Sequence, residues 1–267
     1  MPGSASRESA LEELPQTTWL WLVGWWRIIH FGAQLLVLTL SPSTYVRQNR
    51  GAVASRIYLD TAPILPWFTV LAALISLVII RIVLVTSVSY GLSQYALEMV
   101  VRVLVLELIP LAAAVFAALR CTIPNAADLL VLRERGHFEA LRASGAEPLV
   151  HEVLPRVAAG VFATLMLVTL SSVVTLVLAY LSVYGFIAGG FENYTHTVGQ
   201  VFDSSVSLIF GVKALLLSIA VAVLPIASVL YEGPRMLSRM TAEVQSLLRA
   251  FSAILLIEGA SLAATYY

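Results

Sequence analysis

Few residues in this chain have the type and spacing that catalysis or metal binding requires. The four histidines, at positions 30, 137, 151 and 196, show no metal-ligand spacing, and the lone Cys121 excludes an intrachain disulfide or a cysteine-based metal cluster. Asp203, Ser204 and Ser205 include hydroxyl nucleophiles, but the sequence places no base beside them. No G-x-x-x-x-G-K-S/T phosphate-binding loop occurs, so the chain cannot hydrolyse ATP alone. We therefore expect no catalytic residue, no metal and no cofactor bound by this chain.

The most distinctive polar segment lies between two long apolar runs and is interrupted by glycine and proline. Its first part contains good helix formers, with Glu139 and Arg142 three positions apart on one face. Gly145 can adopt the left-handed conformation that ends a helix, and Pro148 suits the first position of the next helix. The sequence therefore predicts a compact helix–turn–helix, whose second helix ends at Pro155.

Apolar residues are too frequent in this segment, residues 138–156, for a solvated loop. They are Phe138, Leu141, Leu149, Val150, Val153 and Leu154. A membrane protein that only provided a path for a solute would not need such a segment, whereas one that is driven by a soluble motor would. We expect these residues to contact a partner surface.

The composition indicates an integral membrane protein. Of the 267 residues, 59% are hydrophobic and only 12% are charged, and the mean hydropathy is +0.89. Soluble domains have about 25% charged residues. The net charge is zero, so the composition offers no electrostatic basis for binding nucleic acid.

Five apolar stretches are long enough to cross a bilayer, since a crossing helix needs about 20 residues. They are residues 63–85, 97–119, 157–183, 208–230 and 247–265. Lipid offers no hydrogen-bond partner for free backbone groups, so runs of this length must be helices. The predicted fold is an all-α integral membrane protein with five transmembrane helices.

The loops between these stretches alternate in basic content. Arginines occur in 41–62, 120–156 and 231–249, whereas 86–96 and 184–207 have no Lys or Arg. Because basic loops stay in the cytoplasm, we expect a cytoplasmic N-terminus and a C-terminus on the outer side. The helix–turn–helix then lies at the cytoplasmic face.

The segment 19–40 is ambiguous, because it is long enough to span but is amphipathic. Arg27, His30 and Gln34 share one helical face, and four tryptophans crowd its beginning. We favour an interfacial elbow helix, with a sixth crossing as the alternative. The expected organisation is a cytosolic tail (1–18), the elbow helix (19–40), a cytoplasmic connector (41–62) and a transmembrane domain (63–265) that contains the loop 126–156.

Charged residues also occur within the apolar stretches or at their ends. They are Arg81, Glu98, Arg102, Glu107, Lys213 and Glu258. Glu98 and Arg102 are four positions apart and can pair on one helix face. Glu107 needs a partner on another segment, with Arg81 and Arg120 as candidates. For Glu107 and Glu258, which lie deeper, we expect a role in buried packing or in a cavity, because unpaired charges are costly in a bilayer.

Several motifs resemble those of a known family. Glu139-Ala-Leu, followed by Gly145-Ala146 and Pro155, resembles the EAA-type coupling loop of ABC-transporter membrane subunits. In chain order, a longer set is similar to the motifs of the MlaE/YrbE permeases: Glu107-Leu-Ile-Pro110, Arg120, Ala127-Asp128, Glu139, Glu147-Pro148-Leu149 and Pro155-Arg156. Leu106 and the run after Asp128 depart from the family pattern, so the chain looks like a divergent member.

The resemblance implies a lipid transporter in the bacterial inner membrane. The permease would form a homodimer, or one half of a heterodimer, with two cytosolic ABC ATPase subunits that bind ATP-Mg. A periplasmic MCE-domain protein and a STAS-like subunit are further implied partners, and phospholipid is the implied substrate. The implied ATPase-coupling residues are Phe138, Glu139, Leu141, Arg142, Gly145, Pro148, Leu149, Pro155 and Arg156. The implied structural motif residues are Glu107, Pro110, Arg120 and Asp128.

If the family arrangement holds, two copies enclose an apolar lipid cavity that opens toward the periplasm. Its candidate residues are Val85, Tyr90, Leu92, Tyr95, Leu97, Val101 and Arg102, the last of them for a lipid headgroup. Two alternatives stay open. The chain is either an ABC permease for another hydrophobic or small solute, or a membrane scaffold subunit that carries no substrate.

Overall fold

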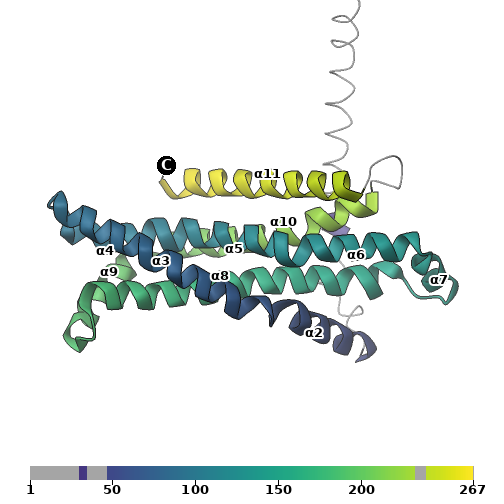
Figure 1. The fold of residues 1–267 in the computed structure, drawn as a ribbon, viewed down its shortest axis with the longest axis horizontal. Helices are drawn as coiled ribbons and strands as arrows, with labels where there is room; N and C mark the ends of the chain where they lie inside the picture. The colour runs from purple at the N-terminus through teal and green to yellow at the C-terminus, as the bar shows by residue number, and fades with distance from the viewer. Residues whose placement is uncertain (1–29, 35–46, 232–238, 267) are drawn as a thin grey trace, which may run out of the picture.

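The computed structural model describes residues 30–34, 47–231 and 239–266, and every regular element in this part of the chain is a helix (Figure 1). The α-helices are α2 (Arg47–Thr61), α3 (Ile64–Ser89), α4 (Ala96–Met99), α5 (Ile109–Ala117), α6 (Ile123–Glu134), α7 (His137–Ala143), α8 (Leu154–Tyr184), α9 (Phe191–Val201), α10 (Ser204–Tyr231) and α11 (Arg239–Tyr266). Wider π-type turns form η3 (Val100–Leu108), η4 (Ala118–Thr122) and η5 (Leu149–Val153).

Five continuous helical stretches are long and apolar enough to cross a membrane. They are Val53–Ser89, Ala96–Glu134, Leu149–Tyr184, Ser204–Leu230 and Ser246–Thr265. Each contains the whole of one predicted apolar stretch, so the prediction of an all-α membrane protein with five crossing helices is confirmed. Large apolar side chains such as Val78 and Leu256, 59% and 69% exposed, cover the outside of the bundle, as lipid contact requires.

Helix α8 lies at the centre of the bundle and packs against α2, α3, α5 and α10, while α11 packs on α10. Figure 1 shows α7 and α9 at opposite ends, with the last turn of α11 at the α9 end. Three groups of buried apolar residues follow one another along the bundle, from Leu129 and Leu154 near α7, through Leu167 and Leu217, to Ile80 and Leu104 near α9. Loops that the basic pattern assigns to opposite sides therefore lie at opposite ends.

Close helix contact at the centre depends on a residue without a side chain. A Cβ atom at Gly160 of α8 would lie 2.8 Å from Cγ2 of Thr122 and 3.1 Å from Cβ of Ala222. Carbon atoms in contact are normally about 3.5–4.0 Å apart. The glycine thus lets α8, η4 and α10 meet, in the manner of small residues at membrane helix interfaces.

Some expectations fall on residues outside the described part: the tail 1–18, most of the elbow helix 19–40, and residues 41–46 of the connector. The described piece 30–34 is helical, with His30 and Gln34 exposed and Phe31 only 2% exposed. This agrees with an amphipathic helix, and the choice between an interfacial and a spanning helix stays a prediction.

One expectation about helix ends is wrong. Pro155 does not end a separate short helix, because η5 and α8 form one continuous helix from Leu149 to Tyr184. Pro155 therefore lies inside a helix, and the wide π-type turn of η5 directly before it accommodates the proline ring and its missing N–H. The sequence also gave no sign of α9, whose Gly, Thr and Asn residues are poor helix formers.

Candidate functional site

The predicted helix–turn–helix exists and forms an elbow at one end of the bundle, consisting of α7, a turn and η5. Gly136 and Gly145 bound α7 with φ angles of 72° and 79°, so both take the left-handed conformation, and the prediction for Gly145 is confirmed. The N–H of Ala146 then donates to the carbonyl of Leu141 at 3.0 Å, which closes the turn. Phe138 is 6% exposed and packs into the adjacent core, so it holds the elbow on the bundle.

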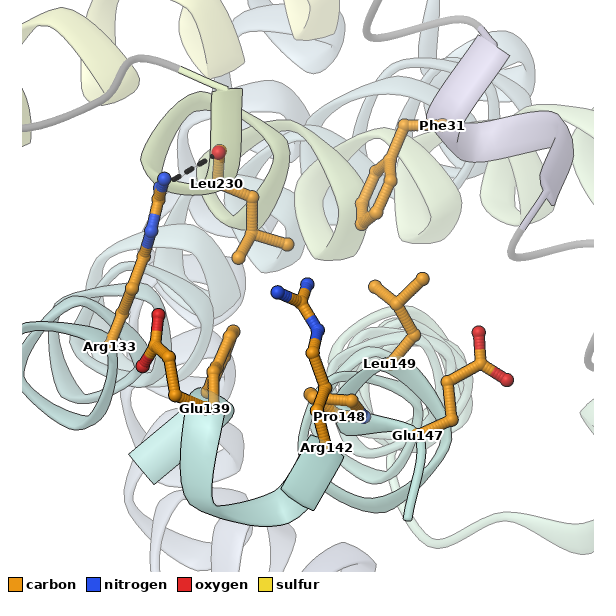
Figure 2. Close-up of a pocket in the computed structure, with 9 residues that line it drawn as sticks. Phe31, Arg133, Glu139, Arg142, Glu147, Pro148, Leu149 and Leu230 are labelled. Carbon is orange, nitrogen blue, oxygen red and sulfur yellow. Dashed lines mark hydrogen bonds between the residues drawn. The ribbon is translucent and has the colours of Figure 1, made fainter. Parts of the chain in front are cut away.

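A cavity of about 370 Å³ lies between the elbow and the ends of α6 and α10 (Figure 2). Its lining residues are Phe31, Arg133, Phe138, Glu139, Arg142, Glu147, Pro148, Leu149 and Leu230. Five of these were predicted for coupling. Sequence reasoning missed Phe31, Arg133 and Leu230 as members of this site, because tertiary packing alone brings them to the elbow. Glu147 lies in the turn of the elbow and belongs to the motif Glu147-Pro148-Leu149, but it was not assigned to coupling.

The charged residues around the cavity differ in their contacts. Arg133 donates to the carbonyl of Leu230 at 2.9 Å and to that of Val229 at 3.3 Å, and it thereby satisfies two carbonyls at the end of α10. Figure 2 shows Arg142 pointing from α7 into the cavity, between Leu230 and Leu149. No ion pair joins Arg142 to Glu139 within the described structure, although their spacing allows one. Exposed pairs of this kind contribute little, roughly 0–1 kcal/mol, so solvation competes with them.

Other predicted coupling residues support the elbow from inside. Arg156 is 9% exposed, donates to the carbonyl of Glu152 at 2.6 Å and pairs with the carboxylate of Glu152. The other oxygen of that carboxylate lies 3.2 Å from Nε2 of His137, so one acid joins α7 to the start of the third span. Pro148 is buried, Leu141 is half-buried and Gly145 is exposed. Arg156 therefore positions the elbow, while Glu139 and Arg142 face solvent.

A second charged cluster lies within the membrane-spanning part. Nζ of Lys213, 2% exposed, pairs with Glu107, donates to Glu258 at 2.8 Å and donates to the carbonyl of Leu106 at 3.0 Å. That carbonyl is available because residue 110, four positions on, is Pro110 and has no N–H to donate. Lys213 on α10 thus contacts the motif residue Glu107 and the carbonyl of the residue before it.

This cluster corrects the partner expected for Glu107. In the described part of the chain Glu107 forms its ion pair with Lys213 and not with Arg81 or Arg120, both of which are exposed. Glu258 is 8% exposed, which agrees with the expectation of buried packing for the two deep acids. Two carboxylates and one ammonium leave a formal charge of −1, and an uncompensated buried charge costs several kcal/mol.

Most of the remaining predicted residues lie toward the α9 end of the bundle. The expected pair of Glu98 and Arg102 is confirmed, with 2.9 Å between Oε1 and Nε, and both side chains are about a third exposed. Val85, Tyr90, Leu92 and Tyr95 are exposed, whereas Leu97 and Val101 are buried in the core near α9. The motif residues Arg120 and Asp128 are exposed as well.

An apolar groove of about 400 Å³ lies between α3 and the second span, and none of the seven lipid-pocket candidates lines it. Its lining residues are Phe68, Leu71, Ala72, Ile75, Ser76, Leu104, Leu108, Ile109, Leu111, Ala112, Val115, Phe116 and Leu119. Ser76 is the single polar side chain among them, and its hydroxyl is already bonded to that of Thr175 at 2.9 Å. The groove therefore suits a hydrocarbon chain.

Comparison with known proteins identifies the family. The curated proteins contain no match. The family model described as Permease MlaE matches residues 53–263, which include the elbow, the buried charge cluster and the apolar groove. Such a permease is the membrane subunit of a transporter and is not an enzyme by itself. The chain belongs to the MlaE permease family.

Proposed function

We propose that this chain is the permease subunit of an ABC transporter that moves phospholipid between the bacterial inner membrane and the outer envelope. A separate cytosolic ATPase, present in two copies, supplies the energy from ATP-Mg. The chain pairs with a second permease copy and with a periplasmic MCE-domain protein. Its N-terminus is cytoplasmic and its C-terminus is periplasmic, as the arginine distribution indicates.

The observation that carries the proposal is that the elbow is anchored to the bundle on one side and presents charged residues on the other. Its underside is fixed to the bundle by Phe138, while Glu139, Arg142 and Glu147 line an open cavity and form no ion pair with any described residue. The elbow also connects two long helices, Ala96–Glu134 and Leu149–Tyr184, directly or through a short turn. A force applied to the elbow would therefore move two spans together, as coupling to a motor requires.

The apolar groove supports lipid as the substrate. A polar solute needs several convergent hydrogen-bonding groups, and the groove offers one hydroxyl that is already bonded. It opens on the face of α3 and α5, where Leu71, Leu108 and Leu119 are exposed. A second copy facing this groove would enclose an acyl chain between the two permeases.

The coupling role is tested by reversing charge at the cavity. Arg142→Glu is expected to weaken co-purification of the ATPase by roughly tenfold or more, since contact residues at the centre of an interface contribute about 2 kcal/mol or more. Glu139→Arg should act in the same direction. Arg135→Glu is the matched control, because Arg135 is exposed on the same loop but does not line the cavity. Normal co-purification and normal lipid transport by both cavity variants would refute the coupling role.

The transport role is tested at the groove. Ala112→Trp fills the groove and should abolish lipid transport and the lipid that co-purifies with the complex, while the ATPase remains bound. Leu255→Trp, on the exposed face of α11 and outside the groove, should leave both unchanged. A scaffold that carries no substrate would show no bound lipid, and it would tolerate Ala112→Trp.

A further inference from the structure

We propose that the cluster of Glu107, Lys213 and Glu258 is a proton-binding site, in which the two carboxyl groups share one excess proton at neutral pH. The cluster joins three membrane-spanning stretches, since its members come from η3, α10 and α11. Its bound ligand is the proton, and its net charge with that proton is zero.

The first argument is that the lysine has no donor left to offer. An ammonium group has three N–H donors, and those of Lys213 go to the carbonyl of Leu106, to Glu107 and to Glu258. Oε2 of Glu258 is fully buried and has no hydrogen-bond partner in the described structure. An ionised carboxylate with a dry, unpartnered oxygen is unfavourable in an apolar interior.

The second argument comes from the two acids themselves. One oxygen of Glu107 and one of Glu258 contact the same Nζ atom of Lys213, so the two carboxyl groups lie close together. Ionised carboxylates only accept hydrogen bonds, so neither acid can donate to the other unless one of them carries a proton. Closely spaced carboxyl groups that share a single proton are a known solution where two like charges cannot both ionise.

Among the residues that the structure describes, no other charged group is bonded to the cluster. Lys213 is the one described residue that forms an ion pair with Glu258 or with Glu107. Helix α5, which packs against α10 and α11, has no titratable residue. On α11, Arg249 is nine positions before Glu258 and bonds to Ser228 of α10, while Arg102 of η3 bonds to Glu98. The second negative charge is therefore neutralised by a proton.

The required effect is large enough to measure. An ordinary carboxyl group is protonated in roughly one molecule in 500 at pH 7, whereas this site would be occupied in most molecules. Because the proton is held between η3 and α11, a motion that separates these helices would release it. The site thus links helix separation to proton release.

Infrared spectroscopy of the full chain in lipid nanodiscs tests the proposal, because a protonated carboxyl has a C=O stretch distinct from that of a carboxylate. The wild type should show one such band at pH 7 that is lost at alkaline pH. Glu258→Gln and Glu107→Gln should each remove the band. In either variant the one remaining carboxylate and the ammonium of Lys213 have zero net charge, so no proton is needed. Glu98→Gln, at the partly exposed pair with Arg102, is the matched control and should keep the band.

Three results would overturn the proposal: no band in the wild type at pH 7, a band that survives both glutamine variants, or a band whose titration follows the Na⁺ or K⁺ concentration. The last would mean that a metal cation neutralises the site.

A melting series gives a second readout. The folded protein holds a proton that the unfolded chain lacks above about pH 5, so the folding equilibrium should weaken by up to about tenfold per pH unit from there until the folded site loses its proton. Glutamine has the shape of the protonated acid, so Glu258→Gln should fold and remove this decline. An equal decline in both proteins would contradict the shared proton.

Discussion

Replacing Lys213 with methionine would leave three acceptors without their donor: the carbonyl of Leu106 and the carboxyl groups of Glu107 and Glu258. Removing one partner of a buried ion pair costs about 3–5 kcal/mol. A carboxylate that has lost its partner can instead become neutral by binding a proton, which costs about 3.7 kcal/mol at pH 7 for a group with an ordinary pKa. The two estimates agree, so we expect Lys213→Met to lower the free energy of unfolding by about 3–5 kcal/mol at pH 7.

For a chain of this size, each kcal/mol lowers the melting temperature by about 2–4 °C, so Lys213→Met should melt roughly 6–20 °C below the wild type at pH 7. The deficit should shrink in acid, because protonating an ordinary carboxyl costs only about 1 kcal/mol at pH 5. The assay is thermal unfolding of the purified chain in nanodiscs at both pH values.

The matched control is Arg102→Met, which removes the partner of Glu98 in a pair about a third exposed. An exposed pair contributes roughly 0–1 kcal/mol, so this variant should melt within a few degrees of the wild type. The reasoning is refuted if Lys213→Met melts as close to the wild type as the control does. It is also refuted if the deficit stays the same at pH 5.

Three further changes test the packing of the bundle by the same melting assay. Gly160→Ala should destabilise the chain by about 1–3 kcal/mol through overpacking, whereas Gly211→Ala, where an added Cβ meets nothing within 4 Å, should not. An equal effect of both would contradict the close helix approach. Thr175→Val removes a buried hydroxyl bond to α3 and should cost about 1–3 kcal/mol, so an unchanged melting temperature would show that this bond adds nothing. Arg133→Met frees the last carbonyls of α10 and should also weaken ATPase co-purification if the elbow is the coupling site.

Local sequence patterns predicted the features that depend on neighbours in the chain. Apolar runs of about 20 residues specify membrane helices by themselves, because lipid leaves the backbone no other way to satisfy its hydrogen bonds. Gly145 at the end of α7 and the pair of Glu98 and Arg102 lie within one turn of helix, and both were predicted correctly. Helix continuity through Pro155 was not, because a wide turn can accommodate a proline that usually ends a helix.

The residues that form the buried charge cluster, the elbow cavity and the apolar groove lie far apart in the chain, and only the tertiary structure brings them together. Lys213 is 106 positions from Glu107 and 45 from Glu258, and no periodic pattern links them. The contact of Phe31 with the elbow and the groove between α3 and α5 likewise depend on how helices pack. Sequence alone determined that this chain crosses the membrane and carries a charged elbow, because solvation acts on each segment separately. Packing decided which charges are neutralised and where an apolar chain can bind, because these depend on distances between segments.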